Sequence, residues 1–227
     1  MGNPPPLPLQ PGDPAPDFVL PSASQEGTVA LSDLRGRPFL IGLFRGLHCP
    51  FCRRQVMQLA AQQPALQAAG VKTVAVINTP LERARQYYRF RPTPLLLLSD
   101  PECRTHEAFG VPRAAFQSPD STETPQWPFR ASLAEFEAAR INPGGVLPEP
   151  TQPMAANAAL NAKDGFEMEP VDGEIAASYG TQLVGHFLID RAGTIAWRHI
   201  EAMEGPNGLC YLPNAAEIAA AVKGLDA

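Results

Sequence analysis

The segment 42–55 has the sequence GLFRGLHCPFCRRQ, along which strand, turn and helix signals follow one another. The apolar run from Pro38 to Phe44 predicts a strand that is covered on both faces. A turn containing Gly46 comes next, followed by a Cys-x-x-Cys made of Cys49 and Cys52 and by a helical pattern. This order predicts a strand that leads into two cysteines at the start of a helix.

The first of these cysteines is predicted to be a nucleophile. Pro50 suits the first turn of a helix, because its missing N–H has no helical partner there. Cys49 would then lie at or just before the helix N-terminus, where the helix dipole and free N–H groups favour a thiolate. Cys52 follows one helical turn later and can reach the same sulfur. We therefore predict a redox dithiol in which Cys49 is the more exposed and more acidic thiol.

Two other interpretations of the cysteines compete with redox chemistry. A zinc site would need a second Cys-x-x-Cys or a His pair, and the remaining cysteines, Cys103 and Cys210, stand alone. The histidines show no metal-ligand spacing either, so no metal is predicted. The second alternative is a pair of buried, inert cysteines. The strand–turn–Cys-x-x-Cys–helix order favours the redox interpretation.

The composition argues against several classes of partner. The chain has 227 residues, is 44% hydrophobic and carries a net charge of −5 without a basic block, so nucleic acid is not expected to bind. Its apolar runs are far shorter than the roughly 18 residues that span a bilayer, and no secretion signal is recognisable. We expect a cytoplasmic protein without membrane contact, in a reducing compartment where cysteines are more often catalytic than structural.

The chain is predicted to form an α/β domain. Residues 1–12 are rich in proline and lack charge, which predicts a flexible arm, and residues 13–227 are expected to form a single domain. From Pro38 to Gly110, strands and helices alternate, which predicts a central sheet with parallel pairs and helices on both faces. One of these helices is expected to start at Pro80 with Thr79 as its cap.

A long insertion interrupts this alternation. Residues 112–180 contain many prolines, and only 131–139 and 173–179 have a helical pattern, so the segment is predicted to be mostly irregular. Residues 183–189 and 194–200 then predict a β-hairpin around a tight turn. The last expected element is an amphipathic helix at 214–222.

Several motifs resemble one known family. They are GDPAPDF at 12–18, LSDLRGRP at 31–38, the strand that leads into Cys49, LSDP at 98–101, FGV at 109–111 and FLIDRAG at 187–193. Together they resemble the alkyl hydroperoxide reductase/thiol-specific antioxidant branch of the thioredoxin superfamily. FRGLHCPFC at 44–52 is similar to its peroxiredoxin-like subgroup with a Cys-x-x-Cys. The resemblance implies a thioredoxin-like fold with a peroxiredoxin-type N-terminal elaboration and a long insertion before the final β-hairpin.

The resemblance also implies Cys49 as the attacking thiol and Cys52 as the resolving thiol. Two positions depart from the family pattern. Peroxiredoxins place Thr or Ser three residues before the attacking cysteine, where this chain has Gly46. They place Arg before the strand at 185–190, where thioredoxins have a cis-proline and this chain has Val184. Arg45 is the candidate for the missing positive charge.

Further residues have candidate roles that compete with ordinary packing. A protonated His48 would favour the thiolate of its neighbour Cys49. The alternative is a solvent-facing His48 that has little effect on the thiol. Cys103 is an alternative resolving thiol, because some peroxiredoxins carry that thiol on the corresponding helix. Cys210, in the loop before the last helix, is a weaker candidate for the same role. Arg53 and Arg54 are expected to be surface charges, although one of them could add to the positive field over the thiolate. The segment 127–130, which contains Trp127, either folds over the cysteines, forms a subunit contact or anchors ordinary packing.

Three functions remain open from the sequence. The first is a peroxiredoxin-like thiol peroxidase that reduces hydrogen peroxide or organic hydroperoxides and is recycled by an external thiol of the thioredoxin, glutaredoxin or glutathione type. The second is a dithiol–disulfide oxidoreductase, favoured by the Cys-Pro-x-Cys and the missing Thr and Arg. The third is a redox-sensing or partner-binding relative without turnover. No cofactor is predicted, and a homodimer is expected because proteins of this superfamily commonly pair.

Overall fold

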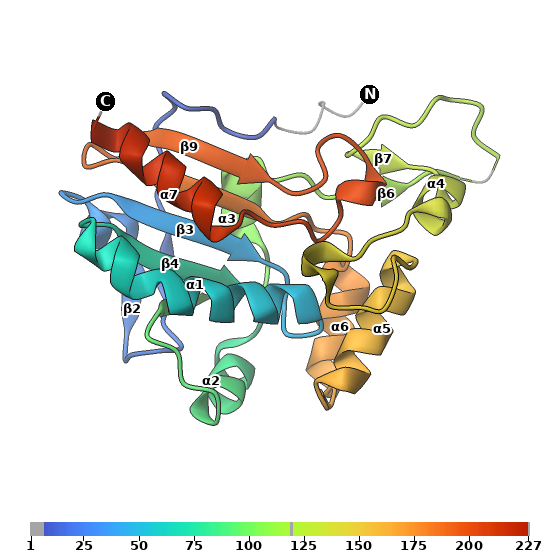
Figure 1. The fold of residues 1–227 in the computed structure, drawn as a ribbon, viewed down its shortest axis with the longest axis horizontal. Coiled ribbons are helices and arrows are strands. Elements are labelled where there is room, and N and C mark those ends of the chain that lie inside the picture. Colours follow the sequence, from blue (N-terminus) through green and yellow to red (C-terminus); the bar gives the residue numbers. More distant parts are fainter. Residues whose placement is uncertain (1–6, 119, 227) are drawn as a thin grey trace.

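The computed structural model describes residues 7–118 and 120–226, and a five-stranded mixed sheet lies at their centre (Figure 1). Its order is β5-β4-β3-β8-β9. The strands are β3 (Phe39–Phe44), β4 (Lys72–Ile77), β5 (Leu96–Ser99), β8 (Gly185–Ile189) and β9 (Ile195–Ile200). β3, β4 and β5 are parallel, whereas β8 is antiparallel to β3 and β9. The predicted α/β class, parallel pairs and final hairpin are confirmed.

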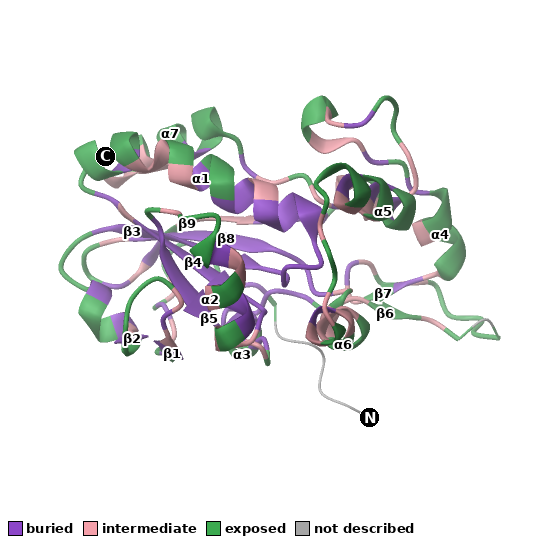
Figure 2. Ribbon diagram, turned by 90° about the horizontal axis from the view of Figure 1, so that it is seen from below, coloured by how far each residue is buried: buried purple, intermediate pink, exposed green. Residues whose placement is uncertain are grey.

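Helices cover both faces of the sheet. α1 (Pro50–Ala68) and α7 (Ala215–Lys223) lie on one face, and α2 (Leu81–Arg89) and α3 (Arg104–Ala108) lie on the other. Figure 2 shows the strands as a buried layer between them. All six residues of β3 are buried, as a continuous apolar run predicts for a strand covered on both faces.

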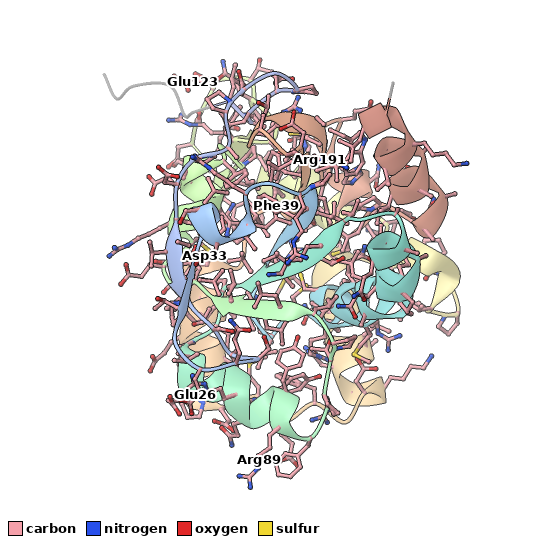
Figure 3. The ribbon with its side chains drawn as sticks, turned by 90° about the vertical axis from the view of Figure 1, so that its left-hand side faces the viewer. Glu26, Asp33, Phe39, Arg89, Glu123 and Arg191 are labelled. Carbon is pink, nitrogen blue, oxygen red and sulfur yellow. The ribbon has the colours of Figure 1, made fainter. Side chains whose placement is uncertain are left out.

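The N-terminal elaboration is a short hairpin that packs beside the edge strand β5. β1 (Val19–Pro21) pairs antiparallel with β2 (Thr28–Ala30), and a 3₁₀ turn, η1 (Leu31–Leu34), follows. Ser22 forms an isolated antiparallel bridge with Leu98 of β5. Figure 3 looks onto this end of the molecule, where Phe39 lies in the interior and charged side chains such as Glu26 and Arg89 project outward. The cysteines lie at the opposite end of β3.

Residues 1–6 of the predicted arm lie outside the described residues, and residues 7–12 pack against the domain. The backbone N–H of Leu9 donates to the carbonyl oxygen of Phe109. The N–H of Gly12 donates to the carbonyl oxygen of Ile195. The prediction of a flexible arm is therefore wrong for residues 7–12, because backbone hydrogen bonds tie them to the domain.

The start of α2 also differs from the prediction. α2 begins at Leu81 with Pro80 in the cap position, one residue later than expected. Thr79 does not cap this helix, because its hydroxyl accepts a hydrogen bond from the backbone N–H of Leu47 at 3.2 Å. That contact ties the turn before the cysteines to the end of β4.

The insertion, residues 112–180, contains more regular structure than expected. It holds the short parallel pair β6 (Ala115–Phe116) and β7 (Arg130–Ala131), with helices α4 (Leu133–Ala138), α5 (Pro153–Lys163) and α6 (Pro170–Tyr179). The prediction of helix only at 131–139 and 173–179 is wrong for α5 and for the first turn of α6. The buried face of α5 is Pro153, Ala156 and Leu160, which is too narrow a pattern to stand out in an alanine-rich segment. In Figure 1 these helices gather beyond the carboxyl end of β3, at the start of α1.

Candidate redox site

The turn after β3 places Cys49 at the N-cap of α1. The Cys49 N–H donates to the Gly46 carbonyl oxygen at 3.0 Å. The Cys49 sulfur accepts a hydrogen bond from the backbone N–H of Cys52 at 3.2 Å, as a capping side chain does. Pro50 is the first residue of the helix, where it was predicted. The two cysteines therefore share one helix terminus.

The two thiols differ in acidity but not in exposure. Cys49 is 1% exposed and Cys52 is 2% exposed, so the prediction that Cys49 is the more exposed thiol is wrong. Burial alone would raise the pKa of Cys49, but hydrogen bonds from Cys52 and the charge and N–H of Arg45 lower it to about 6. Burial and the neighbouring Cys49 raise the pKa of Cys52 well above its usual value. Cys49 is therefore the sulfur that carries negative charge at neutral pH.

A buried arginine lies against the Cys49 sulfur. Arg45 Nε is 3.5 Å from Cys49 Sγ, and Nη1 donates to the Gln182 carbonyl oxygen at 2.9 Å. Nη2 donates to Glu201 Oε1 at 3.0 Å, and the other oxygen of this fully buried carboxylate accepts from the N–H of Val184. Burial opposes the charge on Arg45, but the negative charges of Glu201 and the thiols outweigh it and raise its pKa. Arg45 therefore stays charged beside Cys49.

Sequence reasoning missed Glu201 and Gln182, which hold Arg45 in place. Glu201 lies 156 residues from Arg45 in the chain. The available signal was an acidic residue directly after the last strand of the hairpin, where a buried cation would be needed to balance it. Gln182 contributes a backbone carbonyl, which no side-chain pattern reveals.

The two departures from the family pattern are both buried positions. A Cβ on Gly46 would lie 2.3 Å from the carbonyl oxygen of Asn78, so this turn cannot accept the threonine that peroxiredoxins have here without moving. Val184 is fully buried, and its N–H is bound by Glu201. Polar groups for a substrate must therefore come from elsewhere in the site.

His48 lines the same pocket as Cys49, but the role expected from its protonation is wrong. The ring is 6% exposed, and neither nitrogen has a hydrogen-bond partner within the described part of the chain. Burial and the charge of Arg45 lower the pKa of His48 to about 4. The ring is therefore neutral at pH 7 and cannot stabilise a thiolate by its charge. A neutral imidazole still offers one N–H donor and one acceptor nitrogen.

The structure brings Cys210 to the site and gives Cys103 a different setting. Cys210 Sγ is 3.5 Å from Arg45 Nη2, and Cys210 lines the same pocket as Cys49. Cys103 is the N-cap residue of α3 and is not among the pocket residues. Burial and the charge of Asp100 raise the pKa of Cys103 to about 12. From the sequence, Cys103 was preferred to Cys210 as the alternative resolving thiol. In the structure it is Cys210 that contacts Arg45 and lines the pocket.

A pocket of about 490 Å³ opens beside Cys49. Its polar lining includes Arg45, His48 and Asn157. The insertion supplies most of its apolar lining, namely Ala114, Phe116, Trp127, Ala131, Leu133, Phe136, Met154, Met168 and Ala176. Trp127 therefore lines the pocket beside Cys49, which agrees with the first of the three roles expected for its segment.

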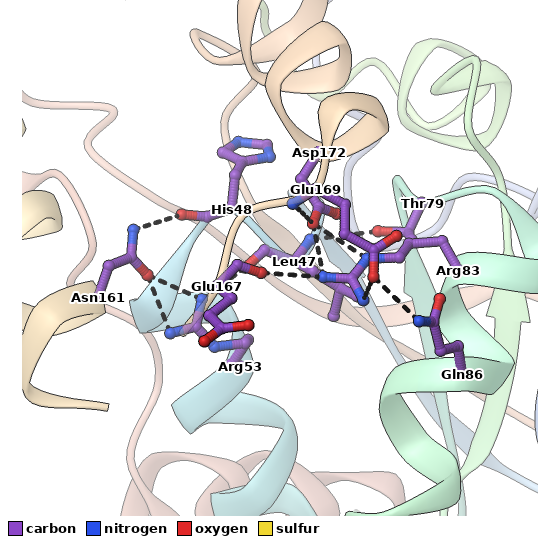
Figure 4. Close-up of polar contacts among 10 residues, drawn as sticks. All are labelled: Leu47, His48, Arg53, Thr79, Arg83, Gln86, Asn161, Glu167, Glu169 and Asp172. Atoms are coloured by element: carbon purple, nitrogen blue, oxygen red, sulfur yellow. Dashed lines mark hydrogen bonds and ion pairs between the residues drawn. The ribbon is translucent and has the colours of Figure 1, made fainter. Parts of the chain in front are cut away.

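Two arginines tie the insertion to the central helices (Figure 4). Arg53 of α1 donates to Asn161 Oδ1 at 3.0 Å and to Asp164 Oδ2 at 3.1 Å. Arg83 of α2 donates to Asp172 Oδ2 at 2.6 Å. Arg53 is only 6% exposed, so its expected place as a surface charge is wrong. The insertion thus covers the start of α1, which explains why Cys49 is buried.

We expect the variant Arg83→Met to unfold more easily. It would leave the carboxylate of Asp172, whose side chain is 2% exposed, without its buried cation. Removing one partner of a buried ion pair costs about 3–5 kcal/mol, which would appear as a lower midpoint in urea unfolding. Arg104→Met is the matched control, because the Arg104–Glu102 pair is exposed and such pairs contribute at most about 1 kcal/mol. Equal midpoints for the two variants would show that Arg83 does not hold the insertion.

Within residues 7–118 and 120–226, no cluster of three or more His, Cys, Asp or Glu side chains is arranged to hold a metal ion. In the same part of the chain, no helix combines the length and apolar character that crossing a membrane requires.

The sheet order, the N-terminal hairpin and an acidic Cys49 at the start of α1 define a peroxiredoxin-like protein with a thioredoxin fold. The chain belongs to the AhpC/TSA family, whose model matches residues 11–198. Peroxiredoxin Bcp of Escherichia coli is 31% identical over 104 residues, and a Bcp peroxiredoxin of Haemophilus influenzae is 32% identical over 104 residues. Each match covers 46% of this chain and 66% of the relative, just under two thirds of its length.

Solved structures show the same fold. Enterococcus faecalis AhpC superposes with a TM-score of 0.57 at 11% identity, covering 95% of this chain and 92% of that chain. A peroxiredoxin-like protein from Aquifex aeolicus superposes with a TM-score of 0.54 at 16% identity, covering 96% and 88%. Both likenesses confirm the predicted thioredoxin-like fold.

Proposed function

We propose that the protein is a thiol-dependent peroxidase in which Cys49 is the attacking thiol and Cys52 the resolving thiol. The observation that carries this proposal is the buried Cys49 sulfur, with a pKa of about 6, bound by Arg45 and open to a pocket. Membership of the AhpC/TSA family and the likeness to named peroxiredoxins support it.

The proposed reaction has two steps. The Cys49 thiolate attacks the terminal peroxide oxygen, the O–O bond breaks, and water or an alcohol leaves with a proton, so that Cys49 becomes a sulfenic acid. Arg45 and the neutral ring of His48 are the candidate donors for the peroxide oxygens, in place of the absent threonine. The Cys52 thiol then attacks the Cys49 sulfur, releasing water and forming a disulfide that an external thiol reopens by exchange.

A single-turnover oxidation tests this function. We expect one equivalent of hydrogen peroxide to consume two thiols of the reduced protein. Trypsin cuts after Arg45 and Arg53, so a Cys49–Cys52 disulfide would stay within the single peptide 46–53. Retention of all four thiols in folded protein would contradict the proposal and favour a relative without turnover.

The lining of the pocket favours organic hydroperoxides over hydrogen peroxide. Ala176 on α6 lines the pocket, so Ala176→Phe would fill space that an apolar substrate needs. We expect kcat/KM for cumene hydroperoxide to fall by about tenfold, as such steric changes in apolar pockets do, with little change for hydrogen peroxide. Ala177→Phe, on the exposed face of the same helix, is the matched control. An equal loss for both peroxides would show that the pocket does not select the substrate.

Disulfide exchange is the second candidate function, and the Cys-Pro-x-Cys at the helix N-terminus favours it. The same Cys49 would then attack a disulfide through a mixed disulfide. The burial of both sulfurs argues against large protein disulfides as substrates. Reduction of insulin faster than reduction of peroxides, under the same recycling conditions, would reverse our order of the two functions.

Three accompanying expectations remain predictions. The recycling reductant is expected to be a thiol of the thioredoxin, glutaredoxin or glutathione type. The protein is expected to be located in the cytoplasm. A homodimer is expected as well, and light scattering at high concentration tests it against the 24.4 kDa monomer mass.

A further inference from the structure

Cys210 has no part in the proposed two-thiol reaction, yet it shares a cation with Cys49. Arg45 Nε is 3.5 Å from Cys49 Sγ, and Arg45 Nη2 is 3.5 Å from Cys210 Sγ. The thiols of Cys49 and Cys210 therefore both contact the guanidinium group of Arg45. Glu201 fixes this arrangement, because Oε1 accepts from both Arg45 Nη2 and the backbone N–H of Cys210.

Cys210 is more exposed than Cys49 and Cys52, and recycling by an external thiol needs an exposed cysteine. Cys49 and Cys52 are 1% and 2% exposed, so a disulfide between them would be closed to a large thiol reductant. Cys210 is part-exposed, and it lies in a loop between η3 (Pro206–Gly208) and α7. Its φ of 64° is uncommon for a residue with a side chain.

The charges favour a fixed order of events. Burial raises the pKa of Cys210, Arg45 opposes this effect, and the negative charges of Glu201 and Cys49 add to it. A Cys49 thiolate therefore helps to keep Cys210 protonated. Once Cys49 is part of a disulfide, its negative charge is gone and Arg45 has only Cys210 left as a sulfur anion to stabilise.

We propose that Cys210 is a third redox thiol. It exchanges with the Cys49–Cys52 disulfide and forms a Cys49–Cys210 disulfide, which the external reductant then reduces. The Cys210 thiolate attacks the Cys49 sulfur, the Cys49–Cys210 bond forms, and the Cys49–Cys52 bond breaks. The electron pair of the broken Cys49–Cys52 bond goes to the Cys52 sulfur, which takes up the proton that Cys210 has lost. The exchange needs no further oxidant, and the external thiol then reduces the Cys49–Cys210 disulfide at the part-exposed Cys210. This proposal rests on the proposed function for the origin of the first disulfide.

Disulfide mapping in a Cys52→Ser variant tests the pairing. The reduced variant is treated with one equivalent of hydrogen peroxide or, in parallel, of diamide, which takes two electrons and two protons from a pair of thiols. We expect a link between tryptic peptides 46–53 and 199–223, which carry Cys49 and Cys210. Cys49 joined to Cys103, joined to a second molecule, or left unpaired in folded protein would overturn the proposal.

The two oxidants separate this proposal from the proposed function. If diamide forms the Cys49–Cys210 link but peroxide does not react, the third redox thiol stands and the peroxidase function fails. If peroxide consumes the Cys49 thiol but neither oxidant links Cys49 to Cys210, the peroxidase function stands and the third redox thiol is wrong.

Recycling kinetics give a second test on the Cys210→Ser variant. We expect reduction of the oxidised protein by reduced thioredoxin to slow by about tenfold relative to reduction by a small phosphine, because the part-exposed cysteine is lost. Cys103→Ser is the matched control and should leave this ratio unchanged. An unchanged ratio in Cys210→Ser would overturn the relay.

Discussion

Replacing Cys49 with serine is expected to abolish peroxide reduction. A serine hydroxyl is far less acidic than a thiol, so the group beside Arg45 would remain a neutral, poor nucleophile at pH 7. Removing an attacking nucleophile commonly costs on the order of 10⁴-fold or more in rate. The measurement is the initial rate of hydroperoxide loss with an excess of thiol reductant.

The control for this variant is Cys103→Ser. Cys103 is also buried, but burial and Asp100 raise its pKa to about 12, and it does not line the pocket. We expect the control to keep full activity. Activity that survives in Cys49→Ser and disappears in Cys103→Ser would mean that the nucleophile has been assigned to the wrong cysteine.

Replacing Arg45 with methionine is expected to shift the pH dependence of Cys49. In the native protein Arg45 helps to lower the pKa of Cys49 to about 6, so reactivity should rise as the pH rises through 6 and be level at 7. Without Arg45 only the hydrogen bonds from Cys52 still oppose the effect of burial, so the pKa of Cys49 rises. The thiolate fraction at pH 7 then falls by about tenfold for each unit by which the pKa exceeds 7. Rates of iodoacetamide alkylation across pH 5 to about 10 would measure both curves.

Loss of Arg45 also affects stability, because Glu201 is fully buried and would lose its cation. Leaving such a charge unpaired costs about 3–5 kcal/mol. The double variant Arg45→Met/Glu201→Gln removes that charge, so it should regain stability while keeping the raised pKa of Cys49. An alkylation midpoint that stays near pH 6 in the double variant would show that the helix terminus alone activates the thiol.

The strand, the turn and the helix N-terminus around Cys49 could be predicted from the sequence. Their signals are local, because an apolar run, a glycine and a proline at fixed spacing determine where β3 ends and α1 begins. The hairpin of β8 and β9 follows from similarly local patterns. Motif resemblance extended these local signals to the thioredoxin-like fold, which the structure and the comparisons confirm.

The environment of the sulfur was decided by tertiary structure. The turn at Cys49 gives no sign that Glu201, 156 residues from Arg45, fixes the guanidinium, or that Cys210, 165 residues away, shares it. The neutral state of His48 and the equal burial of the two cysteines depend on an insertion that folds over the start of α1. Burial and pKa depend on which distant segments exclude water and bring charge, so only the packed chain determines them. The sequence alone determined which residue starts the helix, and the tertiary structure decided which charges and thiols surround it.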